Sequence, residues 1–154
     1  MDIRTRMAMV KSSVTDMSEK VVTSRTLLLT TGMSEVIKVK RGDHNSRVLR
    51  LTVKKDDIHY LDLSNAEVFL VMQKPNGIKL KITGEVINAV NGEVAFALTK
   101  DSLSTSGEAL CEVVKVSEDG AILSTPSFSM TIQESLFDDF MLGFGEDDFT
   151  VITK

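Results

Sequence analysis

Hydrophobic and polar residues alternate with a period of two through the middle of the chain, from about residue 36 to residue 134. Seven short runs carry this pattern, and turn-forming residues separate them roughly every 8–12 residues. The runs are Val36–Val39, Arg47–Val53, Ala66–Gln73, Ile78–Ile82, Val94–Leu98, 108–116 and Phe128–Ile132. Such alternation is typical of strands that bury one face, so each run is predicted to be a β-strand.

The residues between the runs are those that tight turns prefer. Lys74-Pro75-Asn76-Gly77 presets the backbone angle of its proline and places Asn-Gly where positive φ is tolerated, and Asn91-Gly92 repeats the Asn-Gly pair. Connections this short leave no room for crossover helices, so the sheets should be mainly antiparallel. Two sheets that each bury one face pack together. The pattern therefore predicts an all-β protein, an immunoglobulin-like antiparallel β-sandwich of about seven strands with N- and C-terminal arms.

The alternation also predicts the core of the sandwich. The side chains expected to be buried are those of Leu49, Leu51, Val68, Leu70, Phe96 and Phe128. Cys111 lies within a predicted strand and is expected to be a small buried hydrophobic residue. It is the only cysteine, so the chain holds no internal disulfide, and Trp is absent, which argues against an antibody-type domain.

Composition divides the chain into three zones. Residues 1–35 are rich in Met, Ser and Thr and form the predicted N-terminal arm, although residues 27–31 (Leu-Leu-Leu-Thr-Thr) could add an edge strand. Residues 36–134 form the predicted sandwich domain. Residues 135–154 form a predicted C-terminal arm that is both acidic and aromatic.

The C-terminal arm holds four of the seven phenylalanines of the chain, and five acidic residues against one lysine. A segment that served only solubility would not need aromatic side chains, and apolar residues that cannot reach their own core usually contact another chain. The residues predicted to bind a partner are Phe137, Phe140, Met141, Leu142, Phe144 and Phe149. The alternative is that this arm folds back on its own sandwich.

Charge and residue content exclude several classes of function. The net charge is −4 with no basic block, which disfavours nucleic-acid binding, and no run of about 18 apolar residues is present to span a membrane. The two histidines, His44 and His59, lie in turn-like contexts, and neither a catalytic triad nor a phosphate-binding motif is present. The acidic pairs at 56–57 and 138–139 lack the spacing of a calcium loop. We therefore expect no enzymatic activity, no metal and no cofactor.

Three segments, in order, resemble the N-terminal domain of phage baseplate upper proteins. They are VKRGDHNSRVLRLTV from residue 39, LDLSNAEVFLVMQKPNG from residue 61, and the stretch that starts with GEVINAVNGEVAFALTKDSL at residue 84. That family has a Gly-Asp turn before a strand, a Leu-Asp-Leu segment, a Lys-Pro-Asx-Gly turn and an Asn-Gly turn before the next strand. The resemblance covers residues 36–134.

The resemblance also bears on the tripeptide Arg41-Gly42-Asp43, which in exposed loops can be a cell-adhesion ligand. It stands where the family has its Gly-Asp turn, and Gly and Asp are both suited to a turn by their backbone chemistry. The tripeptide is therefore expected to connect two strands.

The resemblance implies a non-enzymatic virion structural protein, made in the host cytoplasm, that joins parts of a tail baseplate or fibre. Its partners would be other virion proteins of the tail hub, baseplate or capsid, and a homo-oligomer is expected. Two alternatives remain open: a capsid-attached head-fibre or decoration protein, and a module that binds a host surface or carbohydrate. The latter would need exposed aromatic side chains, and the predicted strands offer only Phe69, Phe96 and Phe128.

Overall fold

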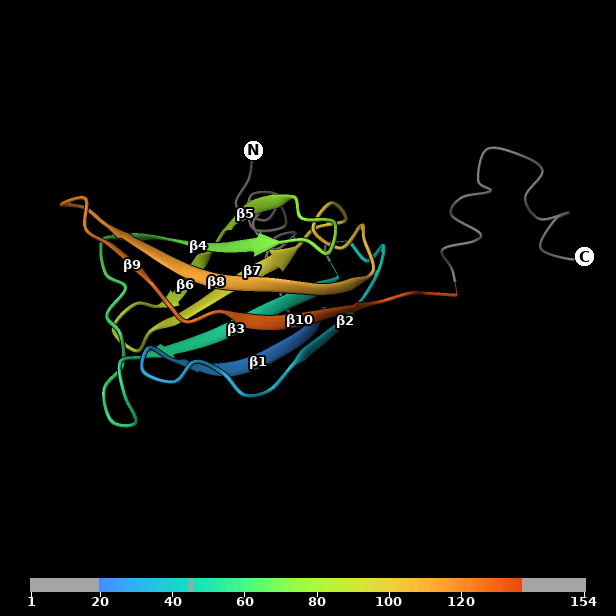
Figure 1. Ribbon diagram of the computed structural model, residues 1–154. Coiled ribbons are helices and arrows are strands. Elements are labelled where there is room, and N and C mark those ends of the chain that lie inside the picture. The colour runs from blue at the N-terminus through green and yellow to red at the C-terminus, as the bar shows by residue number, and fades with distance from the viewer. Residues whose placement is uncertain (1–19, 45, 137–154) are drawn as a thin grey trace, which may run out of the picture.

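The computed structural model describes residues 20–44 and 46–136. Two β-sheets pack face to face in this part of the chain (Figure 1), and it contains no helix. The four-stranded sheet has the order β1-β3-β7-β6, with β1 at Val21–Leu28, β3 at Arg47–Lys54, β7 at Glu93–Leu98 and β6 at Glu85–Asn88. The predicted β-sandwich is confirmed.

The second sheet has six strands in the order β2-β10-β8-β4-β5, with β9 paired to β8 outside this path. Their bounds are β2 Ile37–Lys40, β10 Phe128–Gln133, β8 Gly107–Ser117, β4 Ala66–Gln73, β5 Lys79–Thr83 and β9 Ile122–Ser124. Six of the eight strand pairings are antiparallel, as predicted. The other two, β1 with β3 and β10 with β2, are parallel and lie at sheet edges.

All seven predicted strands are present, together with three further strands. Of these three, only β1 was anticipated in part, because the possible edge strand at residues 27–31 overlaps its last two residues. Strand β6 has only four residues and a register shift between Val86 and Asn88, and β9 has only three residues. Elements this short carry too little alternation to be detected in a sequence. Strand β1 has eight residues, but its sequence VVTSRTLL shows little contrast between its two faces.

Strand β1 also changes where the sandwich begins. The composition placed residues 1–35 in an N-terminal arm, whereas β1 pairs with β3 along its whole length, from Val21 opposite Arg47 to Leu28 opposite Lys54. Its Leu27 is fully buried opposite Val53. The sheet therefore starts by Val21, because a neighbouring strand supplies the hydrogen bonds that the local sequence does not specify.

The core lies between the two sheets and follows the predicted alternation. All six predicted core residues are at most 2% exposed, and Phe96 is the largest side chain that is fully buried. It sits on β7, whose inner face also buries Val94 and Leu98. Gly84, which precedes β6, passes so close to this cluster that a Cβ there would lie 2.6 Å from the Phe96 ring. Packing around Phe96 therefore fixes how the two sheets meet.

Candidate docking surface

The Arg-Gly-Asp tripeptide lies in the connection from β2 to β3, as predicted. Gly42 has a φ of 86°, in the left-handed region that favours glycine. The Arg41 N–H donates to the Gln133 carbonyl oxygen at 2.8 Å, and the Gly42 N–H donates to the Leu103 carbonyl oxygen at 3.0 Å. The backbone of the tripeptide is thus bonded to two distant parts of the chain.

The side chains of this connection are also engaged within the protein. Arg41 Nε donates to the Ser104 carbonyl oxygen at 3.0 Å, and the Asp43 carboxylate forms an ion pair with Arg47 at the start of β3. The Lys100 N–H donates to His44 Nδ1 at 2.8 Å. The arginine, the aspartate and the neighbouring histidine therefore stabilise a structural turn.

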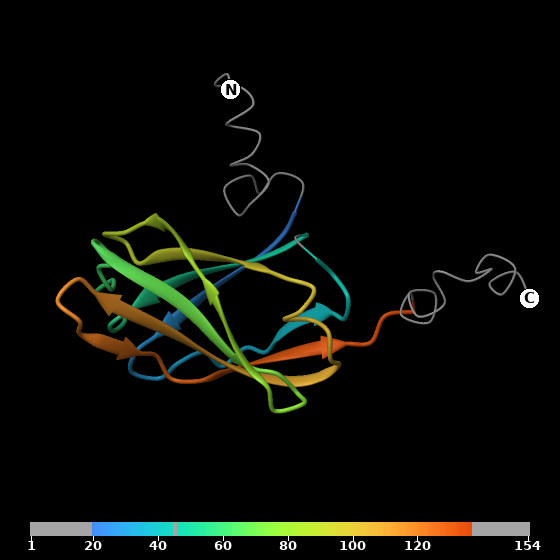
Figure 2. The same ribbon diagram turned by 90° about the horizontal axis from the view of Figure 1, so that it is seen from above.

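The same connection holds both described ends of the chain. The N–H of Val21, the first residue of β1, donates to the Ser46 carbonyl oxygen at 2.7 Å, and Gln133, the last residue of β10, bonds to Arg41. Figure 2 shows the start of β1 and the end of β10 on the same side of the sandwich. We call this side, where the described chain begins and ends, the terminal end.

A buried lysine reinforces the terminal end. Lys74 is only 6% exposed, and its Nζ donates to Ser104 Oγ at 2.7 Å and lies 3.6 Å from Asp101 Oδ1. Arg41 reaches the carbonyl oxygen of the same Ser104. Two cations from different loops therefore hold the loop of residues 99–106 against the turn that holds the chain ends.

The predicted partner-binding residues Phe137, Phe140, Met141, Leu142, Phe144 and Phe149 lie outside the described residues. The last described residue, Leu136, is 95% exposed. Two positions before it, the Glu134 carboxylate accepts a long hydrogen bond of 3.4 Å from Ser106 Oγ. The chain therefore leaves the terminal end beside the 99–106 loop, and the role of the six residues stays a prediction.

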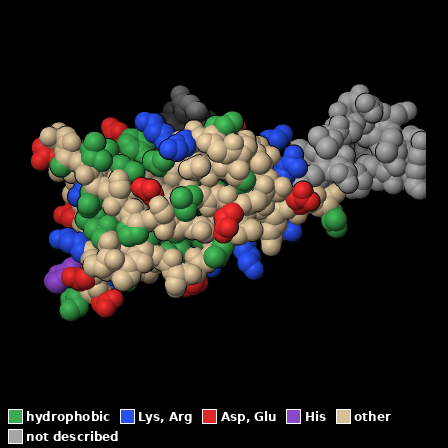
Figure 3. Space-filling view, in the orientation of Figure 1, with side chains coloured by type: hydrophobic (Ala, Val, Ile, Leu, Met, Phe, Trp, Pro, Cys, Tyr) green, Lys and Arg blue, Asp and Glu red, His purple; other side chains and the backbone are tan. Residues whose placement is uncertain are grey.

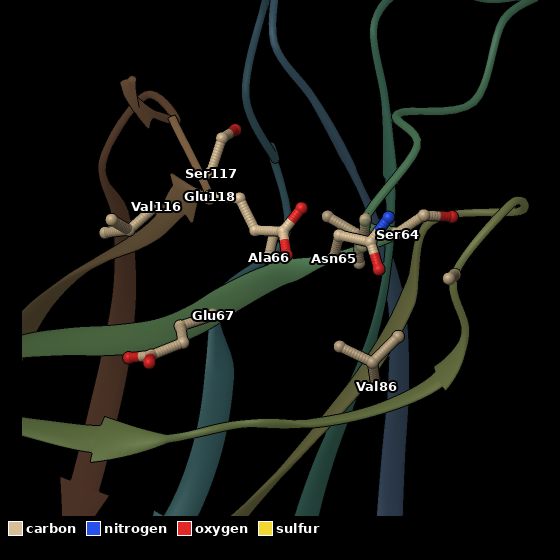
Figure 4. A pocket seen from close by; sticks show the side chains of 10 residues that line it. Ser64, Asn65, Ala66, Glu67, Val86, Val116, Ser117 and Glu118 are labelled. Carbon is tan, nitrogen blue, oxygen red and sulfur yellow. The ribbon is translucent and has the colours of Figure 1, made fainter. Parts of the chain in front are cut away.

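The opposite side of the sandwich, which we call the distal end, contains a hollow of about 620 Å³ (Figure 4). It lies where β4 begins and β8 ends, since Ala66 pairs with Ser117 there, while Gly107 at the other end of β8 pairs with Ile132 beside the chain exit. The lining combines apolar and polar side chains. They are Leu63, Ser64, Asn65, Ala66, Glu67, Val86, Ala89, Val116, Ser117 and Glu118.

The sequence did not reveal this distal hollow. Its walls come from three segments about 20 to 30 residues apart along the chain, 63–67, 86–89 and 116–118. Asn65, just before β4, has a positive φ of 54°, which is uncommon in a residue other than glycine, but this feature is visible only in the structure.

Exposed apolar side chains also lie in the loops of the distal end. Ile58 is 78% exposed, Val90 67% and Ile122 70%, each in or beside a turn at the distal end. Figure 3 shows hydrophobic side chains gathered on the part of the surface where β8 ends and β4 begins. Apolar side chains gathered on one part of a surface are a common feature of protein interfaces.

The titratable candidates are held in local structure. Asp56 accepts hydrogen bonds from His59 Nδ1 at 3.0 Å and from the backbone N–H groups of Ile58 and His59, and these bonds lower the pKa of Asp56 to about 2. Burial raises the pKa of the Cys111 thiol to about 12, so the thiol stays protonated. Within residues 20–44 and 46–136, no three His, Cys, Asp or Glu side chains are grouped to hold a metal ion. The same residues contain no helix that could cross a membrane.

Comparison with solved structures finds the same fold in the N-terminal domain of ORF48 of phage TP901-1, at a TM-score of 0.60 and 15% sequence identity. The match covers 73% of this chain and 98% of that one. CopC from Methylosinus trichosporium OB3b matches at a TM-score of 0.44 and 12% identity, over 66% of this chain and 86% of that one, which is too remote to inform function. No curated protein matches the sequence.

A family model, that of the BppU N-terminal domain, matches residues 10–150. The chain belongs to the BppU N-terminal domain family. This family is that of the baseplate upper protein N-terminal domain, so the predicted resemblance is confirmed. The match to the BppU model extends beyond residues 36–134 on both sides. Membership gives the protein a structural role in a phage baseplate and places it in the virion.

Proposed function

We propose that this protein is a non-enzymatic adaptor of a phage tail baseplate, and that it docks onto neighbouring virion proteins through the segments that leave its terminal end. The observation that carries the proposal is the connection between β2 and β3. Ser46 in this connection bonds to the first strand, and Arg41 bonds to the last strand. The segments before Val21 and after Gln133 therefore both leave from one braced platform, from which each can reach a neighbouring protein.

The composition of the C-terminal segment supports this role. Aromatic anchors that fill pockets on a partner typically contribute about 2 kcal/mol or more each. Phe137, Phe140 and Phe144, with Met141 and Leu142, supply such anchors. The acidic residues among them would meet a basic rim on the partner, which makes the contact sensitive to salt. We infer that the partner is another protein of the tail hub or baseplate.

The chemistry of the sandwich supports a role without catalysis. His44 accepts a bond from the Lys100 backbone, and His59 is bound to Asp56, so each imidazole has a local structural function. Cys111 is buried among core side chains with its thiol protonated. A nucleophile needs a base in contact and access for a substrate, and Cys111 has neither feature of an activated thiol.

A carbohydrate-binding role has less support. Aromatic platforms for sugars need exposed ring faces. Among the aromatic residues in the described part of the chain, Phe96 and Phe128 are buried and Phe69 is partly covered, with Lys81 Nζ 4.5 Å from its ring centre. Tyr60 is 45% exposed, and Lys54 Nζ lies 5.0 Å from its ring centre. A head-fibre station has no specific support, because the family is one of the baseplate.

The test is complementation of virions that lack this protein. A chain truncated after Gln133 should melt like the full chain, because β10 is complete, and should be missing from purified particles. A matched variant with Phe137, Phe140 and Phe144 changed to Ala keeps the length and charge of the segment and should also fail. Normal occupancy of either variant in the particles would show that the C-terminal segment is dispensable and would overturn the proposal.

A further inference from the structure

The side chains that line the distal hollow indicate which kind of side chain it can bind. Its walls include the apolar side chains of Leu63, Val86, Ala89 and Val116. Two carboxylates, Glu67 and Glu118, lie on its border, and neither has an ion-pair partner within the described part of the chain. In Figure 4 the Glu118 side chain extends over the start of β4, beside Ala66 and Asn65.

Among residues 20–44 and 46–136, no cation lines the hollow to neutralise these two carboxylates. The nearest lysine on β8, Lys115, donates its Nζ to the Asp62 carbonyl oxygen at 2.7 Å. An apolar hollow with acids at its border fits a side chain that has an aliphatic stem and a cationic head, because the stem covers apolar surface while the head pairs with the carboxylates. Arginine and lysine are the residues with this form.

The chain itself contains a segment with such side chains. Residues 1–11 read MDIRTRMAMVK and carry Arg4, Arg6 and Lys11 against a single acid, Asp2, in a protein whose net charge is −4. Ile3 before the cations and Met7, Met9 and Val10 between Arg6 and Lys11 supply apolar side chains, and methionine adapts to irregular surfaces. The segment therefore complements the distal hollow in both charge and polarity.

The point at which β1 begins indicates whether residues 1–11 reach the hollow of their own copy or that of a neighbouring copy. Strand β1 starts at the terminal end, so the chain enters the sandwich at Val21, on the side opposite to the hollow. To enter its own hollow, the segment would have to reverse and run the length of the sandwich, about 36 Å for the eleven residues of β8. If a neighbouring copy is placed end to end with this one, its distal hollow faces the terminal end of the first copy. The N-terminal segment can then enter that hollow without reversing its direction.

We propose that residues 1–11 of one copy dock in the distal hollow of the next copy, with Arg4 or Arg6 paired to Glu67 and Glu118. The contact joins the terminal end of one copy to the distal end of the next, and such a head-to-tail interface closes into a ring when the rotation between copies allows it. The inference rests on the proposed baseplate role and on the expectation that the protein forms a homo-oligomer. It assigns the N-terminal segment to contacts between copies and leaves the C-terminal segment to the baseplate partner.

The first experiment titrates a synthetic peptide of residues 1–11 into the full-length Arg4→Gln/Arg6→Gln variant and follows backbone amide shifts by NMR. Shifts should concentrate in residues 63–67, 86–89 and 116–118. The Glu67→Gln/Glu118→Gln change, added to that variant, should weaken binding by about tenfold, as expected for the loss of two border ion pairs. The matched change Glu108→Gln, at an exposed position near the other end of β8, should leave the affinity unchanged. A peptide affinity that does not change when both carboxylates are removed, or no binding at millimolar peptide, would overturn the proposal.

The second experiment separates contact between copies from contact within one copy. Thr5→Cys, which keeps both arginines, in one preparation and Ser117→Cys in another are mixed and oxidised, and Cys111 stays protected by burial. A disulfide-linked dimer of the two variants, lost at 1 M salt, is the expected result. A disulfide within a single chain carrying both changes, without linkage between chains, would show that the segment folds back on its own sandwich and would overturn the inference.

The failure of this inference and the failure of the proposed function give different results. If residues 1–11 do not bind the hollow, the Glu67→Gln/Glu118→Gln variant still enters virions at normal occupancy. If the proposed docking role of the C-terminal segment is wrong, the Gln133 truncation enters virions while the peptide still shifts the residues of the hollow.

Discussion

Both ends of the sandwich are built from loops, but the polar side chains of these loops are paired differently at the two ends. At the terminal end, Arg41 and Lys74 both bond to Ser104, and the Asp43 carboxylate pairs with Arg47. At the distal end, the carboxylates of Glu67 and Glu118 form no ion pair or hydrogen bond in the described part of the chain, and both residues line the hollow. A sheet scaffold can thus bond its polar groups internally where the chain is anchored, and leave carboxylates unpaired at an end where its loops enclose a hollow.

The prediction with the largest expected effect tests whether one core between the sheets supports both ends of the sandwich. Phe96→Ala removes the largest fully buried side chain and should lower the free energy of unfolding by about 3–5 kcal/mol. Urea denaturation measures the change. Ile122→Ala, at a 70% exposed position of the distal end, is the control and should change stability by less than about 0.5 kcal/mol. Similar melting curves for Phe96→Ala and the wild type would show that the packing between the sheets is misassigned.

The second prediction compares the two ends directly. Lys74→Met keeps the aliphatic stem but removes the bond to Ser104, and should cost about 1–2 kcal/mol in free energy of unfolding. Glu118→Gln at the distal end should leave stability unchanged, because the carboxylate has no partner to lose. Lys79→Met, at an exposed position of β5, controls for the loss of a lysine charge. An equal cost for Lys74→Met and Glu118→Gln would remove the contrast between the ends.

The third prediction concerns the Arg-Gly-Asp turn. Asp43→Asn should lower the free energy of unfolding by less than about 1 kcal/mol, because the ion pair with Arg47 is partly exposed. A double-mutant cycle with Arg47→Met isolates the pair, and the coupling should be small but positive. Zero coupling would mean that Asp43 does not hold the turn in solution.

The smallest effect is local to the distal end. The bonds from His59 and from two backbone N–H groups lower the pKa of Asp56 from its ordinary value of 3.8 to about 2. Because the pKa is lowered in the folded protein, the ionised carboxylate stabilises the loop fully at pH values above the ordinary pKa of 3.8. This contribution to stability is lost as the pH falls through about 2. NMR titration of the carboxyl carbons should give this low midpoint, and His59→Ala should raise it. The pKa of Asp62 is lowered mainly by Ser64, so its midpoint should not move with His59→Ala. An Asp56 midpoint near 4 in the wild type would show that the loop is not ordered as described.

The strands that the sequence predicted best are those whose burial is decided by their own alternation. Ala66–Gln73 was predicted with both of its observed bounds, because Val68, Leu70 and Met72 face the core and the residues between them do not. The six predicted core residues were right for the same reason. Side chains alternate across a strand wherever that strand lies in a sheet, so a period of two can be read without knowing the neighbours.

The edges and the ends of the sandwich were decided only by the tertiary structure. Strand β1 depends on eight residue pairings with β3, and these parallel partners are separated in sequence by β2, which lies in the other sheet. The distal hollow depends on three loops whose proximity follows from the packing of both sheets. The position of both chain ends beside Arg41 and Ser46 depends on where β1 and β10 join their sheets. Local sequence sets which face of a strand is apolar, whereas hydrogen bonds between distant segments set which strands are neighbours and what their loops enclose.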